Sequence, residues 1–415
     1  MKTALIMAAG TGGHIYPGIA IAQVLETRGF NIVWLATPNG MEHKLVGKVG
    51  YPIEVVAMSG VRGKGKAAWL TLPFVLLRAF WQSLAVLRRV KPDVVISMGG
   101  YIAFPGGMMA VLLGKPLVVH EPGAHAGLTN RVLALIADRV LVGFPKSFDQ
   151  VPHNRIAKLL PKPDRVEWLG TPVREDITKL SLPSERSAGR SGPLRLLVVG
   201  GSLGAKTMND LIVAAVATIP PDQRPEVVHQ SGEKNYADLV KAYGIAKVQA
   251  EVKPFIDDMA AMYTWCDVII CRAGAITVAE LAAAGVASIL IPLPWFVAEE
   301  QLANAKFLAD AGAGLLVNQK TETAQGLAQK IASMTREKAV AMATIARSLG
   351  KPDATVACAE ICGGLARNIK SNISISSQVY AAIASRLPGL KNAAAPRAIC
   401  APPPMPQRRL FCDET

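Results

Sequence analysis

The stretch LIMAAGTGGHIYPG, residues 5–18, decides the fold. A short apolar run leads into a loop with three glycines, and residues with a helical pattern follow the loop. Strand, glycine loop and helix in this order are typical of a doubly wound α/β domain, in which the helix N-terminus faces an anion. The same order returns at RLLVVGGSLGAKTMNDLI, residues 195–212. Because the unit occurs twice, the sequence predicts two such domains.

The rest of the chain has the pattern of an α/β protein. Its 415 residues exceed the size at which a single core usually stops growing, and 51% of them are hydrophobic. Apolar runs alternate with helical patterns to about residue 365, which predicts parallel sheets with helices on both faces. The strands predicted in the first half are 3–8, 31–36, 53–57, 93–97, 117–119 and 139–142. Those predicted after the second glycine loop lie near 226–229, 248–250, 267–270, 287–290 and 314–316.

The expected segments follow from where this pattern changes. KLSLPSERSAGRSGPL, residues 179–194, is rich in Ser, Gly, Pro and charge, which is typical of a linker. The end of the chain is rich in Ala and Pro and shows no periodicity, which predicts a flexible tail. We therefore expect an N-terminal domain over 1–165, a linker over 166–192, a C-terminal domain over 193–350, a C-terminal helix over 351–368 and the tail over 369–415.

The formal net charge of +14 points to an anionic partner. Basic residues between 62 and 91 are interleaved with Trp69, Phe74, Phe80 and Trp81, a mixture that favours a membrane interface. Aromatic residues make up only 6% of the chain, so we expect no nucleic-acid partner. Pro73, Arg78 and Gln82 interrupt the apolar run and argue against a spanning helix. A helix on the bilayer surface and a buried core helix both remain open.

The composition also bears on metals and cofactors. The six cysteines have no paired C-x-x-C spacing, and no D-x-D or His-carboxylate cluster occurs, so we expect neither a metal nor another cofactor. A dinucleotide fingerprint needs a third glycine and an acid after the second strand. Ile15 stands in place of that glycine, and WLATPNG, residues 34–40, has no acid. What remains is a phosphate-facing loop, formed by the N–H groups of Thr11, Gly12 and Gly13.

His14 lies at the mouth of this loop. An imidazole titrates near neutral pH, so it suits a general base in a ligand-binding loop. A helix-capping histidine without chemistry fits the same position. Spacing alone leaves these two interpretations equal.

Further glycine turns indicate a ligand with several phosphates, or two phosphorylated ligands. The turn in VVISMGGYIAFPGG, residues 94–107, follows a strand. Ser202 of the second repeat either caps the following helix and also donates to a phosphate, or serves as a cap alone. In CRAGAITVAELAAAG, residues 271–285, Glu280 suits a vicinal diol such as a ribose, or is an exposed helix glutamate. Arg174 is a candidate to neutralise a diphosphate.

A set of motifs in fixed order resembles the MurG family of bacterial glycosyltransferases over about residues 1–365. The motifs are GTGGHIYPG, SMGGY, HEPGAHAGLTNR, GTPVR, VVGGSLGAKTMN, HQSG, PFIDDMAAMYTWCDVIICRAGAITVAELAAAG and EEQLANA. The resemblance implies a GT-B fold, in which two Rossmann-like doubly wound parallel-sheet domains face a central cleft. It implies inverting, metal-independent transfer of N-acetylglucosamine from UDP-GlcNAc to lipid I, an undecaprenyl-diphosphate-linked muramoyl-pentapeptide. The product, lipid II, serves peptidoglycan synthesis, and the enzyme is peripheral on the cytoplasmic side of the inner membrane.

The resemblance also implies roles for single residues. His14 is the base on the acceptor hydroxyl, and Gly99, Gly100 and Tyr101 serve the acceptor diphosphate. Glu280 binds the ribose, main chain near Ile256 lies by the uracil, and Gln301 reads the sugar hydroxyls. The remaining residues implied in donor binding are Thr11, Gly12, Gly13, Gly123, Arg174, Ser202, Ala275, Ile276, Thr277, Val278 and Ala279.

Some positions depart from the family pattern. Pro122 and Gly123 replace Gln-Asn, so an amide contact is missing or is supplied elsewhere, for example by His125. Thr171 replaces Asn and Leu203 replaces Gln. Three other functions stay open beside the leading one: a transferase to a different lipid such as diacylglycerol, a UDP-GlcNAc epimerase, and a nucleotide-sugar sensor without activity.

Overall fold

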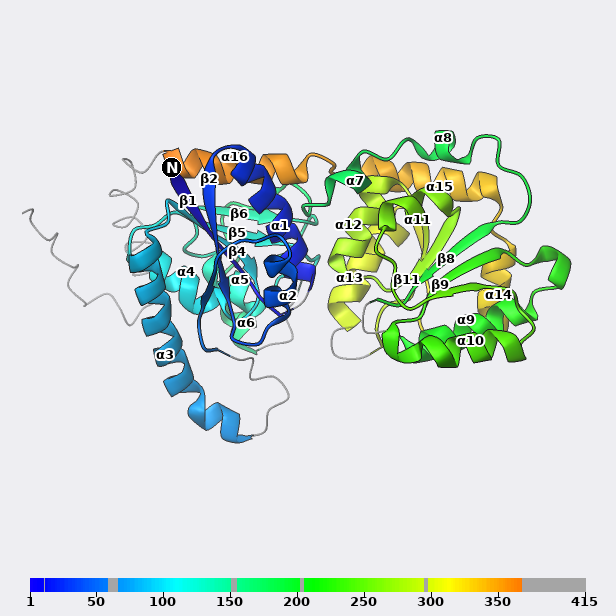
Figure 1. Cartoon of the computed structure of the whole chain (residues 1–415), viewed down its shortest axis with the longest axis horizontal. Helices are drawn as coiled ribbons and strands as arrows, with labels where there is room; N and C mark the ends of the chain where they lie inside the picture. Colours follow the sequence, from blue (N-terminus) through cyan, green and yellow to red (C-terminus); the bar gives the residue numbers. More distant parts are fainter. Residues whose placement is uncertain (11, 59–65, 151–154, 202–204, 295–297, 368–415) are drawn as a thin grey trace, which may run out of the picture. The chain divides into compact units, whose positions relative to one another are not determined.

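A computed structural model describes residues 1–10, 12–58, 66–150, 155–201, 205–294 and 298–367. Thr11, Ser202 and the expected tail over 369–415 lie outside the described residues. The described chain forms two parallel β-sheets (Figure 1). The first has the strand order β3-β2-β1-β4-β5-β6-β7 and the second the order β10-β9-β8-β11-β12-β13.

The first sheet belongs to the N-terminal half. Its strands are β1 (Lys2–Ala8), β2 (Phe30–Ala36), β3 (Ile53–Val55), β4 (Val94–Gly99), β5 (Leu117–Glu121), β6 (Arg139–Val142) and β7 (Glu167–Trp168). The helices of this half are α1 (Gly12–Thr27), α2 (Met41–Gly47), α3 (Lys66–Val90), α4 (Ala103–Leu112), α5 (Leu128–Leu133) and α6 (Arg155–Leu159). β1 pairs with both β2 and β4, so the glycine loop that follows β1 leaves from the middle of the sheet.

Alternation along β1 divides its side chains between two buried layers. Ile6 packs in the layer that includes α1, whereas Leu5 and Met7 pack in the layer that includes α3 and α4. Both faces are therefore apolar, as expected of a parallel sheet covered by helices on each side. The last helix, α16 (Ala354–Arg367), completes the α1 layer through Cys358, Ala359 and Cys362.

The second sheet repeats this arrangement. Its strands are β8 (Arg195–Val199), β9 (Glu226–Gln230), β10 (Glu251–Lys253), β11 (Val268–Cys271), β12 (Ala287–Leu290) and β13 (Gly314–Leu316). The helices of this part are α7 (Glu175–Thr178), α8 (Pro183–Ser187), α9 (Lys206–Thr218), α10 (Tyr236–Ile245), α11 (Met259–Trp265), α12 (Ala275–Ala284), α13 (Ala298–Ala309), α14 (Ala324–Ala332) and α15 (Arg336–Leu349). Short 3-10 turns cover Pro221–Gln223 and Glu233–Asn235.

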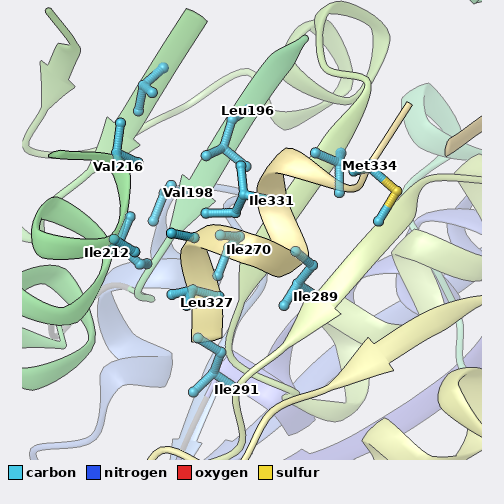
Figure 2. Close-up of a cluster of buried hydrophobic side chains, with 14 of the residues drawn as sticks. Leu196, Val198, Ile212, Val216, Ile270, Ile289, Ile291, Leu327, Ile331 and Met334 are labelled. Carbon is cyan, nitrogen blue, oxygen red and sulfur yellow. The ribbon is translucent and has the colours of Figure 1, made fainter. Parts of the chain in front are cut away.

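One face of the second sheet is covered by α9 and α14. Figure 2 shows Leu196 and Val198 of β8 in one cluster with Ile212 of α9 and Leu327 of α14, all of them buried. Neighbouring Leu197 points into the opposite layer, which α11, α12 and α13 cover. The second half is thus doubly wound like the first.

Side-chain caps fix where several helices of this half begin. The Asp258 carboxylate accepts from the Ala261 N–H at 2.8 Å at the start of α11, and Thr323 and Thr335 cap α14 and α15 in the same way. At the end of α12, Gly285 has φ +65, the left-handed conformation that glycine adopts without strain.

Most predicted strands are confirmed, with two differences. The strand predicted near 248–250 is β10, Glu251–Lys253, because pairing with Val228 to Gln230 of β9 selects the later residues. The two-residue strand β7 had no sequence signal, since it exists through its pairing with Leu141 and Val142 of β6.

Candidate active site

His14 lies in the first turn of α1 and packs against the turn that follows β4. Gly99 has φ +103, and a β-carbon built there would come within 2.9 Å of His14 Cδ2 and 3.0 Å of Nε2. Gly100 has φ +86, and its β-carbon would meet the Ala9 carbonyl oxygen at 2.5 Å. Glycine is required at both positions, because a side chain would separate the two loops. The structure thus brings the predicted residues His14, Gly99 and Gly100 together.

Burial shapes the chemistry of His14. The imidazole is half-buried, and desolvation lowers its pKa to about 4. The ring is therefore neutral at pH 7, the form in which an imidazole accepts a proton. Tyr101, in the same turn, is partly buried and packs against the apolar layer that includes α3 and α4.

Glu121, which sequence reasoning missed, closes this site at the end of β5. Its carboxylate accepts from the N–H groups of Gly123 at 3.0 Å and Gly127 at 3.1 Å, and from Asn130 Nδ2 at 3.0 Å. Burial raises the pKa of Glu121 to about 7, although these hydrogen bonds lower it. Asn130 also lies beside Gly99, since its Nδ2 would be 3.2 Å from a β-carbon there. Glu121 and Asn130 therefore support the His14 turn from behind.

His120 precedes Glu121 and is fully buried. Its Nε2 lies 3.0 Å from the Gly170 carbonyl oxygen, and burial lowers its pKa to about 4. Proximity to His14 lowers that pKa further. The only sequence signal for these two residues was a His-Glu pair at the end of a strand.

Gly123 and its loop are tied to α13. The Gly123 N–H donates to Glu121, and its carbonyl accepts from Ser147 Oγ at 2.8 Å, so both main-chain groups have partners. The next N–H, of Ala124, donates to Asn304 Oδ1 at 2.8 Å. Asn304 Nδ2 in turn donates to the Ala273 carbonyl at 3.1 Å. This buried bridge was not predicted, because nothing in the sequence pairs the two segments.

Glu280 is buried and hydrogen-bonded. Only 8% of its surface is exposed, so the interpretation as an exposed glutamate is wrong. The Tyr263 hydroxyl donates to Oε2 at 3.0 Å, and Arg174 Nη2 lies 3.5 Å from Oε1. Burial raises the pKa of Glu280, and the charge of Arg174 and the Tyr263 hydroxyl lower it. The predicted residues Arg174 and Glu280 therefore meet.

Glu280 lies on α12, which begins at Ala275. Gly274 is the N-cap and supplies no side chain, and no hydrogen bond from a described side chain caps this end. The N–H groups of Ala275, Ile276 and Thr277 are thus in the first turn, where a helix favours an anion or a polar ligand group. The side chains of Ile256 and Val278 are buried in the apolar layer formed by α11, α12 and α13. These two residues can therefore contact a ligand only through their main-chain groups.

Gln301 on α13 has a fixed orientation. The Leu293 N–H donates to its Oε1 at 3.0 Å. A backbone N–H only donates, so the carboxamide oxygen must face it and the Nε2 donor points elsewhere. Gln301 is therefore suited to donate to a hydroxyl oxygen.

Comparisons with known proteins place the chain in a family. The model of the glycosyltransferase family 28 N-terminal domain matches residues 4–142, and that of its C-terminal domain matches residues 195–357. The chain belongs to glycosyltransferase family 28. Within it, the resemblance to MurG is confirmed by relatives at about half identity over nearly their whole length.

Two curated relatives and one crystal structure illustrate the similarity. The UDP-N-acetylglucosamine--N-acetylmuramyl-(pentapeptide) pyrophosphoryl-undecaprenol N-acetylglucosamine transferase of Cupriavidus necator is 52% identical over 367 residues, 88% of this chain and 99% of the relative. The protein of the same name in Aromatoleum aromaticum is 52% identical over 370 residues, 89% of this chain and 99% of the relative. The crystal structure of Acinetobacter baumannii MurG has a TM-score of 0.75 and 37% identity, covering 88% of this chain and 100% of that one. The predicted GT-B fold is confirmed.

None of the described helices is long and apolar enough to cross a membrane. Within the same residues, no three His, Cys, Asp or Glu side chains cluster as a metal would require.

Proposed function

We propose that this protein transfers N-acetylglucosamine from UDP-GlcNAc to lipid I and so forms lipid II for peptidoglycan, with release of UDP. The observation that carries this proposal is the 52% identity over 99% of the Cupriavidus necator transferase, whose name states both donor and acceptor. The buried Glu280 and the glycine turns around His14 supply groups that suit a nucleotide sugar and a phosphate-linked acceptor.

The donor binds around α12. The Glu280 carboxylate accepts hydrogen bonds from the ribose hydroxyls, and the main chain beside Ile256 contacts the uracil. Arg174 neutralises the diphosphate together with N–H groups of Gly12, Gly13 and the first turn of α12. Thr11 and Ser202 are further donor contacts, and Gln301 donates from Nε2 to a sugar hydroxyl. Gly123 has the weakest support among the donor residues, because both of its main-chain groups are already bonded.

The reaction is a single displacement with inversion at the anomeric carbon. The acceptor sugar hydroxyl attacks that carbon, and the bond to the UDP oxygen breaks. Negative charge grows on the departing diphosphate, where Arg174 and helix N–H groups stabilise it in place of a metal ion. His14 takes the proton from the attacking hydroxyl.

A base whose pKa is lowered to about 4 by burial needs a higher pKa in the complex with substrate. The acceptor diphosphate provides it, because a nearby negative charge favours the imidazolium and raises the histidine pKa. N–H groups at Gly99, Gly100 and Tyr101 hold this diphosphate beside His14.

The acceptor is a membrane lipid, and α3 is suited to reach it. Phe74, Leu77 and Trp81 are 76%, 59% and 66% exposed, and their spacing places them on one face of the helix. Arg78 and Arg88 lie on the same helix. We assign to α3 a peripheral contact with anionic lipid on the cytoplasmic side of the inner membrane.

An acceptor comparison tests the assignment against its alternatives. Purified protein receives UDP-GlcNAc with a lipid I analogue, with diacylglycerol, or with no lipid, and all products are separated. We expect glycosylated lipid only with the lipid I analogue. Glycosylated diacylglycerol would indicate the other lipid transferase, and an altered nucleotide sugar without lipid would indicate an epimerase. No turnover in any arm would favour the sensor.

A further inference from the structure

Tyr263 holds the carboxylate of Glu280 by a buried hydrogen bond. Its ring is almost fully buried on α11, in the same apolar layer as Val278 of α12. The hydroxyl donates to Glu280 Oε2 at 3.0 Å. The opposite oxygen, Oε1, has the longer contact of 3.5 Å, to Arg174. The tyrosine is thus the closer of these two partners.

These two partners differ in how firmly they are held. The Arg174 side chain is 37% exposed, and the proposed function moves it to the diphosphate when the donor binds. The packed ring of Tyr263 has no such freedom. Rotation about the last bond of a glutamate meets little resistance, so a carboxylate without a fixed partner samples many orientations. A vicinal diol needs both oxygens in one plane at one angle.

We propose that Tyr263 is a positioning residue for nucleotide recognition, which orients Glu280 so that its two oxygens accept the ribose diol. The inference rests on the proposed function of the site and adds a residue to it. The tyrosine touches no ligand and acts only through Glu280.

Binding of UDP and 2′-deoxy-UDP to the full chain, measured by calorimetry, tests this role. The wild type is expected to prefer UDP by about tenfold to a hundredfold, the range of one hydrogen bond to a charged group. Tyr263→Phe keeps the ring and removes only the hydroxyl, so the core stays filled. We expect this variant to lose most of that preference while its affinity for 2′-deoxy-UDP changes little. An unchanged preference would overturn the inference, as would equal weakening of both ligands.

Two further variants sharpen the result. Tyr243→Phe is the matched control, because Tyr243 is also buried in this half but its hydroxyl lies 2.8 Å from His229 Nδ1. It should retain the wild-type preference, and a loss there would contradict a specific role for Tyr263. In a Glu280→Gln background, Tyr263→Phe should lower the preference no further. If Tyr263→Phe fails to fold, 3-fluorotyrosine at 263 strengthens the donor and should raise the preference; a fall would overturn the inference.

Transfer to the lipid I analogue is assayed on the same samples and separates the two proposals. If the Tyr263→Phe variant loses the preference for UDP and the wild-type protein shows no transfer, the inference is supported and the proposed function is rejected. Normal transfer with ribose preference unchanged in the variant rejects only the inference.

Discussion

The imidazole of His14 packs against Gly99 on the side where a side chain would stand, with Cδ2 2.9 Å from the position of a β-carbon. Two glycine turns from neighbouring strands therefore share one small space, and the candidate base occupies it. A methyl group at Gly99 has no room unless His14 moves.

Gly99→Ala is predicted to displace His14 and to lower kcat by about tenfold to a hundredfold, because misplacing a catalytic group by about 1 Å has effects of this size. Steady-state kinetics with lipid acceptor provide the measurement. Gly29→Ala is the control, since Gly29 also has positive φ, +81, but no atom within 4 Å of its β-carbon. Equal losses in both variants would mean that backbone strain, and not contact with His14, is responsible.

His14→Ala is predicted to lower turnover by ~10²–10⁴-fold, the usual contribution of a general base. UDP-GlcNAc affinity should stay within about twofold, because the imidazole serves the acceptor hydroxyl and not the donor. Single-turnover rates and calorimetry separate the two effects. Turnover at the wild-type rate would reject His14 as the base.

The exposed face of α3 predicts binding to anionic vesicles. Phe74→Ser, Leu77→Ser and Trp81→Ser together should reduce sedimentation with phosphatidylglycerol vesicles by at least tenfold, because their apolar surface no longer enters the interface. Val240→Ser with Ile245→Ser is the matched control, since both are exposed apolar residues of α10. Unchanged vesicle binding in the α3 variant would contradict the assignment. Trp69 is a further candidate whose side chain lies outside the described residues.

Stability is predicted to fall in acid through buried neutral histidines. Burial lowers the pKa of His229 from 6.5 to about 3, so the unfolded chain takes up its proton first. The contribution of the neutral His229 to the free energy of unfolding is complete above pH 6.5. It is lost as the pH falls toward 3, at up to about 1.4 kcal/mol per pH unit. His229→Gln should therefore flatten the dependence of unfolding free energy on pH between 6 and 4. A slope like that of the wild type would show that His229 titrates normally.

The effect of Glu121 on stability depends on pH in the opposite direction, so it serves as an internal comparison. Its pKa is raised from 4.5 to about 7, so its contribution is complete below pH 4.5 and is lost as the pH rises through 7. Glu121→Gln should remove the decline in stability between pH 5 and 8. Denaturant unfolding at several pH values measures both variants.

Local patterns predicted much of the fold and part of the site. An apolar run followed by a glycine-rich loop at residues 5–18 is a local signal, and the strand predicted from it, 3–8, begins one residue after the start of β1. β7 and the position of β10 depend on pairing with strands distant in sequence, which no local pattern records.

The same limit holds within the site. His14, Arg174 and Glu280 stand in recognisable motifs, but the contact between Arg174 and Glu280 joins residues 106 positions apart. Glu121, Asn304 and Tyr263 acquire their roles only through buried hydrogen bonds formed on folding. Their residue types alone indicated no partner.

The central claim is tested most directly by following label from UDP-GlcNAc into lipid. Purified protein is incubated with labelled donor, with and without a lipid I analogue, in buffer containing EDTA. We predict lipid-bound label and stoichiometric UDP only when the analogue is present, at a rate that EDTA leaves unchanged. Absence of label from the lipid, while the wild-type protein still binds UDP-GlcNAc, would contradict the assignment.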